Sequence, residues 1–204
     1  MVTTSWVKAG IVGAAAAALF AGCNPPPPES GNYETRISAL RAATNEQFQK
    51  SSDPVPDSRK ARLLPLDYYP IDPAYNVPAT LTPSDDPTIF EMPTSSGQPR
   101  RERRAGTLHF TLQGQPMTLT AFVEADAPNL NRLFVPFGDT TSGKETYPAG
   151  RYIDLARTPT GLYELDFNRA YNPYCYYNES YECPLPPSEN KLKIPIHAGE
   201  KVKK

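Results

Sequence analysis

Near the start of the chain, residues 33–50 show the spacing of a helix. One helical face would carry Ile37, Leu40, Thr44 and Phe48. Asn32 precedes this run as a candidate N-cap, and Glu34 lies in the first turn, where a negative charge suits the helix dipole. The sequence therefore predicts one amphipathic helix, which the Ser-, Asp- and Pro-rich residues 51–57 end.

The later part of the chain alternates with the two-residue period of half-buried strands. Leucine and phenylalanine occupy every second position of residues 107–112, and residues 117–123 repeat the alternation. Gln113 and Gly114 stand between these runs, so a tight hairpin is the simplest connection.

Shorter runs predict further strands. We expect strands at residues 133–137, 152–155, 162–168 and 192–196, and residues 152–155 should pair with residues 162–168. Three earlier runs that proline interrupts also predict strands, at residues 64–71, 75–81 and 88–92. Proline confines such strands to sheet edges, strand starts or bulges. Eight or nine short strands favour a mainly β fold: a single antiparallel sandwich or barrel-like domain over residues 33–204, with the one N-terminal amphipathic helix as a lid or support.

The first residues have the layout of a secretory leader. One lysine precedes the apolar residues 9–21, which are too few for the roughly 20 residues that a membrane-spanning helix needs. Residues 19–23 (LFAGC) resemble the lipobox of bacterial lipoproteins, which implies a signal peptide at 1–22, diacylation of Cys23 and a Pro-rich tether at 23–32. Asn24 resembles the residue that follows the cysteine in outer-membrane lipoproteins. An ordinary secretory peptide with an incidental cysteine is the alternative.

Composition and net charge limit the classes of partner that the protein could bind. The chain has 204 residues, 39% hydrophobic and 21% charged, which is typical of a folded domain. Lys and Arg number 21 against 22 Asp and Glu, so there is no net field to attract nucleic acid. We expect no nucleic-acid partner.

Several longer motifs resemble a known family. They lie at residues 66–70 (LDYYP), 134–137 (FVPF), 145–152 (ETYPAGRY), 165–175 (LDFNRAYNPYC), 183–190 (CPLPPSEN) and 198–201 (AGEK). Together they resemble the bacterial family of domain of unknown function 1684 over roughly residues 45–201. The family has no established activity, so the resemblance implies relatives and no function.

Two cysteines remain once Cys23 is acylated. In an oxidising compartment, a disulfide between Cys175 and Cys183 is the simplest interpretation. Closing this ring would add about 2.6 kcal/mol of stability in the chain-entropy model. A reactive thiol is the alternative, although neither cysteine has an adjacent His or Lys to lower its pKa.

Five tyrosines gather before and between these cysteines. They are Tyr171, Tyr174, Tyr176, Tyr177 and Tyr181. Flat rings with a polar tip stack on sugars or apolar ligands, so this segment is a candidate recognition surface. Packing of the loop against the sheet is the alternative.

Polar residues of the last predicted strands form the second candidate site. A hairpin would bring Arg151 near Asp166 as a charge-assisted pair, and nearby polar residues would complete a ligand site: Asn168, Tyr171, Asn172, Glu189 and Asn190. If the protein is an enzyme, the catalytic candidates are Asp166, Glu145, Glu189 and Arg151, acting as a hydrolase. A purely structural Arg–Asp pair is the alternative.

His109 and His197 are far apart and lack the spacing of a metal site, so we expect no metal and no cofactor. The sequence favours a lipid-anchored binding module of the bacterial cell envelope. Its partner would be the membrane, through the anchor, together with a small molecule, glycan or protein; an envelope hydrolase is the second hypothesis.

Overall fold

The structure is a computed structural model that describes Met1 and residues 30–203. Two helices come first, α1 (Ser30–Lys50) and α2 (Asp57–Leu63). The strands are β1 (Asn76–Pro83), β2 (Ile89–Met92), β3 (Arg100–Leu112), β4 (Gln115–Glu124), β5 (Arg132–Phe137), β6 (Arg151–Ala156) and β7 (Tyr163–Asp166). Short helical turns are η1 (Pro73–Tyr75), η2 (Phe167–Arg169), α3 (Tyr174–Tyr177) and η3 (Ser188–Asn190).

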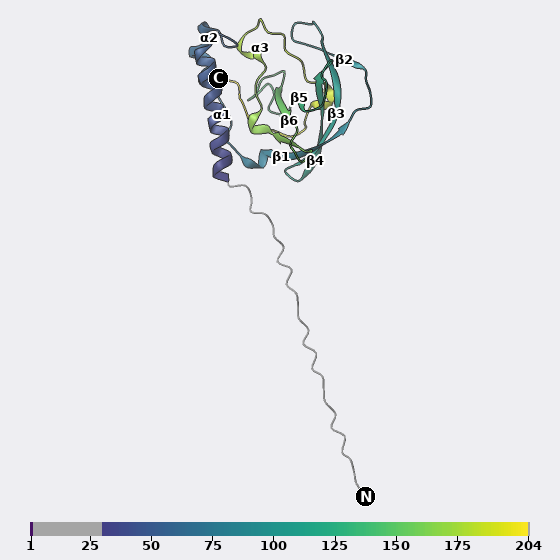
Figure 1. Cartoon of the computed structure of the whole chain (residues 1–204). Helices are drawn as coiled ribbons and strands as arrows, with labels where there is room; N and C mark the ends of the chain where they lie inside the picture. Colours follow the sequence, from purple (N-terminus) through teal and green to yellow (C-terminus); the bar gives the residue numbers. More distant parts are fainter. Residues whose placement is uncertain (2–29, 204) are drawn as a thin grey trace.

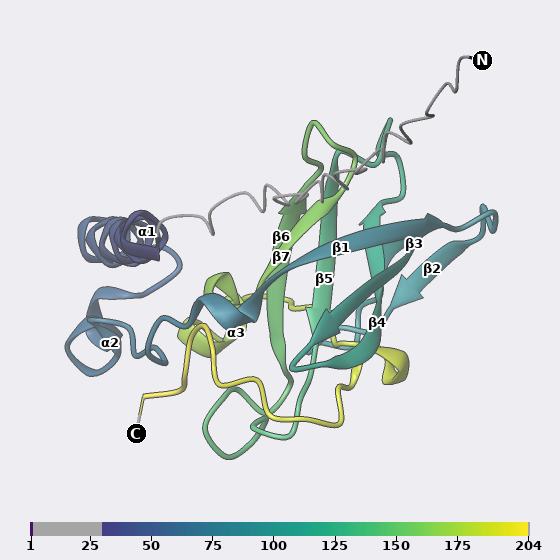
Figure 2. The same cartoon turned by 90° about the horizontal axis from the view of Figure 1, so that it is seen from below.

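The strands form one antiparallel sheet that curls into a nearly closed barrel. The order along the sheet is β6-β5-β4-β3-β1-β7, and β2 pairs with β3 outside this path. The end strands β6 and β7 lie in contact, and Figures 1 and 2 show the strands wrapped around a common interior. The predicted mainly β, antiparallel, barrel-like fold is confirmed, with seven strands in residues 30–203 rather than eight or nine.

The alternating residues of the strands fill the barrel interior. The core includes Leu108, Phe110, Leu112, Leu119, Ala121, Val123, Leu133, Val135, Phe137, Ile153, Leu155, Leu165 and Phe167. The predicted hairpin is present, since Leu112 pairs with Gln115. Gln113 and Gly114 have φ of 51° and 75°, the left-handed pair of a type I′ turn.

Strand β1 shows how proline fits inside this sheet. Its first half, residues 76–79, pairs with β7, and its second half, residues 80–83, pairs with β3. Pro78 lies in the first half, where β1 has a ladder partner on one side only. The missing N–H of Pro78 can therefore face away from the ladder.

Three strand predictions are wrong. Residues 64–71, which contain Pro65 and Pro70, form no strand, and only a single bridge joins Tyr68 to Glu200. The expected pairing of residues 152–155 with 162–168 does not form, because β6 pairs with β5, β7 pairs with β1, and a single bridge joins Arg157 to Tyr163. Residues 192–196 form no strand but an extended segment that contains Pro195 and buries its apolar side chains in the barrel.

Helix α1 lies along one side of the barrel (Figures 1 and 2). It buries Tyr33, Ile37 and Phe48, whereas Leu40, expected on the buried face, is 45% exposed. The helix begins at Ser30, two residues before the expected N-cap Asn32, so the last residues of the expected tether are helical. Within the described residues, no helix is both long enough and apolar enough to span a membrane. The predicted signal peptide and Cys23 lie outside the described residues.

Candidate functional site

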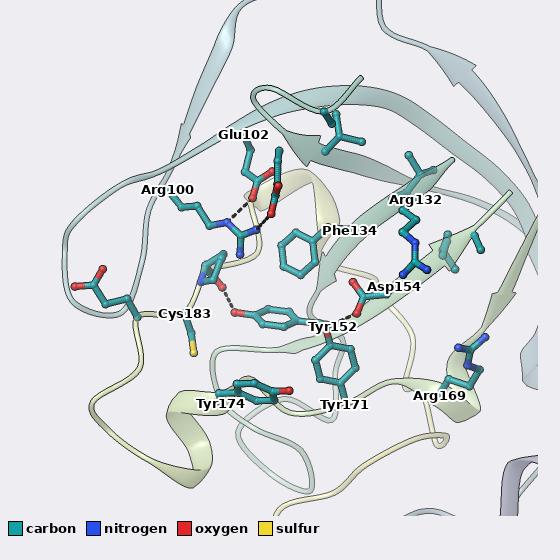
Figure 3. Close-up of a pocket in the computed structure, with 18 of the residues that line it drawn as sticks. Arg100, Glu102, Arg132, Phe134, Tyr152, Asp154, Arg169, Tyr171, Tyr174 and Cys183 are labelled. Atoms are coloured by element: carbon teal, nitrogen blue, oxygen red, sulfur yellow. Dashed lines mark hydrogen bonds and ion pairs between the residues drawn. The ribbon is translucent and has the colours of Figure 1, made fainter. Parts of the chain in front are cut away.

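A groove of about 830 Å³ lies on the outer face of the barrel. Strands β3 to β6 form its floor, and the segment that begins with Arg169, the last residue of η2, forms its wall (Figure 3). The lining residues from the strands include Arg100, Glu102, Glu124, Arg132, Phe134, Tyr152 and Asp154, and those from the wall include Arg169, Tyr171, Tyr174, Tyr181, Glu182, Cys183 and Pro184.

The two-residue period of the strands explains the floor. Leu133 and Val135 of β5 point into the barrel core, so Phe134 between them points outward. The ladder places Phe134 opposite Phe122 of β4 and Asp154 of β6. Outward residues from neighbouring strands therefore meet on one surface.

The wall places three of the five tyrosines on the groove. Tyr171, Tyr174 and Tyr181 line it, and the Tyr171 hydroxyl donates to Asp154 Oδ2 at 2.7 Å. Tyr176 and Tyr177 instead pack with Phe48 below α1. Three of the five tyrosines therefore line the groove, and the other two pack below α1.

One end of the groove holds an arginine between two carboxylates. Arg100 Nε lies 2.6 Å from Glu102 Oε1, and Arg100 Nη2 lies 3.6 Å from Glu124 Oε1 (Figure 3). Glu102 and Glu124 face each other across β3 and β4. Glu102 is fully buried, and desolvation raises its pKa, which Arg100 opposes.

The other end holds two exposed arginines. The side chains of Arg132, at the start of β5, and Arg169, in η2, form no hydrogen bond or ion pair with the described residues. Both lie on the same side of the groove as Asp154 in Figure 3. These side chains, with Asp154 Oδ1, offer donors and an acceptor to a bound molecule.

Cys175 and Cys183 lie side by side next to this groove. Both are buried free thiols in the structure, so the predicted disulfide is not formed in it. The Cys175 backbone N–H donates to Cys183 Sγ at 3.0 Å, and the Tyr147 hydroxyl lies 3.8 Å from Cys175 Sγ. The hydrogen bond from the Cys183 thiol lowers the pKa of Cys175, although no cation adjoins it.

The predicted pairing of Arg151 with Asp166 is wrong. Arg151 is 1% exposed, and its Nη2 donates to Asp139 Oδ2 at 2.9 Å. It also donates to the carbonyl oxygens of residues 196, 198 and 200. The pairing fails because β7 lies beside β1 rather than β6. Arg151 therefore fastens the C-terminal segment to the barrel and does not line the groove.

Asp166 and Asn168 hold α1 against the barrel. Asp166 Oδ1 accepts from the Tyr33 hydroxyl at 2.7 Å and from the Asn168 backbone N–H at 3.0 Å. Asn168 Nδ2 donates to the Tyr33 hydroxyl and to the Asp72 carbonyl. Burial raises the pKa of Asp166. Both side chains therefore join α1 to the barrel, and neither lines the groove.

The other candidate residues, Glu145, Glu189 and Asn190, each contact a different part of the protein. Glu145 lies 3.8 Å from His197, and Glu189 lies 3.4 Å from Arg104. Asn190 is fully buried and bonds the backbone of Thr120. The four catalytic candidates thus do not meet at one site, which removes the cluster that the hydrolase hypothesis required.

Sequence reasoning missed most of the groove floor. Residues 100–104 are arginine-rich apart from Glu102, and this charge pattern alone does not indicate a groove, yet the run supplies Arg100 and Glu102 to the floor. The outward position of Phe134 was the available signal, because an alternating strand must expose one face. Within residues 30–203, no group of three His, Cys, Asp or Glu side chains forms a metal site.

Comparison with known proteins gives the family. The family model described as protein of unknown function (DUF1684) matches residues 62–201. The chain belongs to the DUF1684 family. This DUF1684 protein is also similar to a solution NMR structure of the uncharacterized protein from gene locus rrnAC0354 of Haloarcula marismortui, with 34% identity and a TM-score of 0.65. That match covers 85% of this chain and 96% of the other. A comparison with curated proteins finds no match.

Proposed function

We propose that this DUF1684 protein is a lipid-anchored binding module of the bacterial cell envelope that holds a neutral glycan in its groove. The observation that carries the proposal is the groove itself. Its volume of about 830 Å³ falls within the range of small-molecule sites. Its floor comes from rigid strands, which hold side chains in place more firmly than loops do.

The chemistry of the lining favours sugars. Tyr174 is 42% exposed and Phe134 is half-buried, so both rings offer faces to a sugar ring. The charged lining residues nearly balance, with three arginines against four acids. A neutral ligand rich in hydroxyl groups matches this mixture of donors and acceptors better than a strongly charged one.

The N-terminal motif supports the anchor. Removal of residues 1–22 and acylation of Cys23 would supply the two or more lipid chains that stable membrane binding needs. Asn24 supports the outer membrane in a cell that has one. The short Pro-rich segment before α1 would then hold the domain close to the membrane.

The same compartment supports a disulfide. Exported proteins meet an oxidising environment, and Cys175 and Cys183 are already in contact through the 3.0 Å hydrogen bond to Cys183 Sγ. Oxidation of this pair would fix the wall that carries Tyr174 and Tyr181.

The groove is tested with the mature lipoprotein extracted in detergent. Its affinity is measured for neutral oligosaccharides of glucose and N-acetylglucosamine and for glycan strands from bacterial envelopes. We expect the wild type to bind these glycans, and we expect Tyr174→Ala to weaken the affinity at least tenfold. Tyr174→Phe keeps the aromatic ring and is the control, so its affinity should stay within about twofold of the wild type. Absence of glycan binding, or equal affinity of Tyr174→Ala and wild type, would refute the proposal.

The anchor is tested by metabolic labelling with an alkyne fatty acid. We expect label on the wild type in the membrane fraction, and no label with release from the membrane for Cys23→Ser. A chain that keeps residues 1–22 and carries no acyl mass at Cys23 would refute the envelope assignment.

A further inference from the structure

A second cavity, of about 320 Å³, lies between α1 and the barrel. Helix α1 contributes residues that include Ile37, Arg41, Thr44 and Phe48. The rest of the lining comes from Tyr68, from Asp154 of β6, from the segment that begins in η2, and from Glu200. Asp154, Arg169, Tyr171 and Tyr174 line both this cavity and the groove. The two concave surfaces therefore adjoin along these four residues.

Two buried polar atoms, each on a residue that lines this cavity, lack hydrogen bonds among the described residues. Asn172 is 1% exposed; its Nδ2 donates to the Lys201 carbonyl at 3.0 Å, which identifies the other atom as Oδ1. That Oδ1 atom has no partner among the described residues. The same holds for Arg41 Nε, while the Arg41 Nη atoms donate to the carbonyls of Tyr69 and Asn168. Buried polar groups in proteins are rarely left unpaired, so each such atom needs an explanation.

Glu200 adds a second acceptor. Its Oε2 accepts from the Asn172 N–H at 2.9 Å and from the Tyr177 hydroxyl. Its Oε1 has only the Tyr68 hydroxyl, at 3.4 Å. This oxygen retains the capacity for a stronger bond. The residues that line the cavity thus carry one unpaired donor and two acceptors with spare capacity.

One part of the cavity wall is apolar and aromatic. Phe48, Tyr174 and Tyr177 pack edge to face below α1, and Ile37 lies on the same side of the helix. Its volume is at the low end for small-molecule sites, which suits a ligand of one ring. A sugar hydroxyl both donates and accepts, and the C–H face of a sugar packs on aromatic rings.

We propose that this cavity is a side pocket that receives one sugar ring of the glycan held in the groove. The inference rests on the proposed glycan function and names a second part of that site. A branch or a chain end would pass over Tyr171 and Tyr174, which border both surfaces, and place a hydroxyl between Arg41, Asn172 and Glu200.

The test fills the pocket without touching the groove floor. Thr44 is half-buried, and its hydroxyl bonds only the Leu40 carbonyl of its own helix. We expect Thr44→Phe to weaken binding of envelope glycan strands about tenfold, and Thr44→Ser, which leaves the space open, to change it less than twofold. Phe134→Ala reports on the groove alone, and thermal unfolding checks that each variant folds.

A second measurement needs no variant. Adding the same strands to isotope-labelled wild type should shift the backbone amide signals of Thr44, Asn172 and Glu200 as well as those of Phe134. If Phe134→Ala weakens binding while Thr44→Phe and the three pocket signals stay unchanged, the side pocket is refuted and the groove proposal stands. If wild type binds no strand, both proposals fall. If water alone satisfies the buried atoms, the pocket signals remain unchanged with every probe, which also refutes the side pocket.

Discussion

Replacing Glu200 with glutamine tests the buried environment below α1. Glu200 is 3% exposed and accepts hydrogen bonds from the Asn172 N–H and the Tyr177 hydroxyl. Burial raises its pKa from 4.5 to about 7, against the opposing effect of these donors and of Arg151. Glutamine has nearly the same shape, its oxygen accepts the same two bonds, and it does not ionise in this range.

The direction of this pH dependence follows from the number of protons that the folded and unfolded states bind. The folded state holds this proton up to about pH 7, whereas the unfolded chain releases it near 4.5. The contribution of Glu200 to the free energy of unfolding is therefore complete below pH 4.5 and is lost as the pH rises through 7. At about 1.4 kcal/mol per pH unit, the loss is about 3 kcal/mol.

The assay is urea unfolding of wild type and Glu200→Gln between pH 4 and 9 under reducing conditions. The free energy of unfolding of wild type minus that of the variant should fall by about 3 kcal/mol between pH 4.5 and pH 8. Glu46→Gln is the matched control, because Glu46 is an exposed glutamate that pairs with Lys50 on α1. A Glu200→Gln difference that is flat, or that rises with pH, would refute the reasoning.

Three further changes test other contacts. Asp139→Asn keeps the side-chain shape but leaves Arg151 as a buried cation without its carboxylate, and should cost about 3–5 kcal/mol in urea unfolding; a cost below about 1 kcal/mol would contradict the buried pair. Gly199→Ala should cost about 2–4 kcal/mol, because φ is +78° and a Cβ would lie 2.6 Å from the Ala170 carbonyl oxygen. Gly114→Ala, with φ of +75° and open space, should cost about 1–2 kcal/mol, and equal costs would argue against the close approach. Oxidation of Cys175 and Cys183 should raise the free energy of unfolding by about 2.6 kcal/mol, with no redox effect in Cys175→Ala; labelling of both thiols in the native exported protein would count against the disulfide.

Local patterns in the sequence predicted the elements that local physics controls. The alternation around Gln113 and Gly114 predicted the β3–β4 hairpin, because turn and register act over adjacent residues. The helical spacing between residues 33 and 50 predicted α1, although Leu40 is exposed. Exposure depends on which part of the helix the barrel covers, and this is a tertiary property.

Such local patterns do not predict contacts between residues that are distant in the chain. Arg151 was assigned to Asp166 on the assumption that consecutive strands pair, yet β7 joins β1 at the other end of the sheet. The acceptors of Arg151 come instead from Asp139 and from the C-terminal segment. The groove floor was missed for the same reason, since Glu102 and Asp154 meet only through the registers of four strands.

The attachment of residues 196–200 to Arg151 couples this segment to the barrel. The guanidinium takes three of its acceptors from the carbonyls of residues 196, 198 and 200. Without this segment, the buried cation would keep only the Asp139 carboxylate among the hydrogen-bond partners that the structure describes. We therefore expect the segment and the barrel to unfold together as one unit.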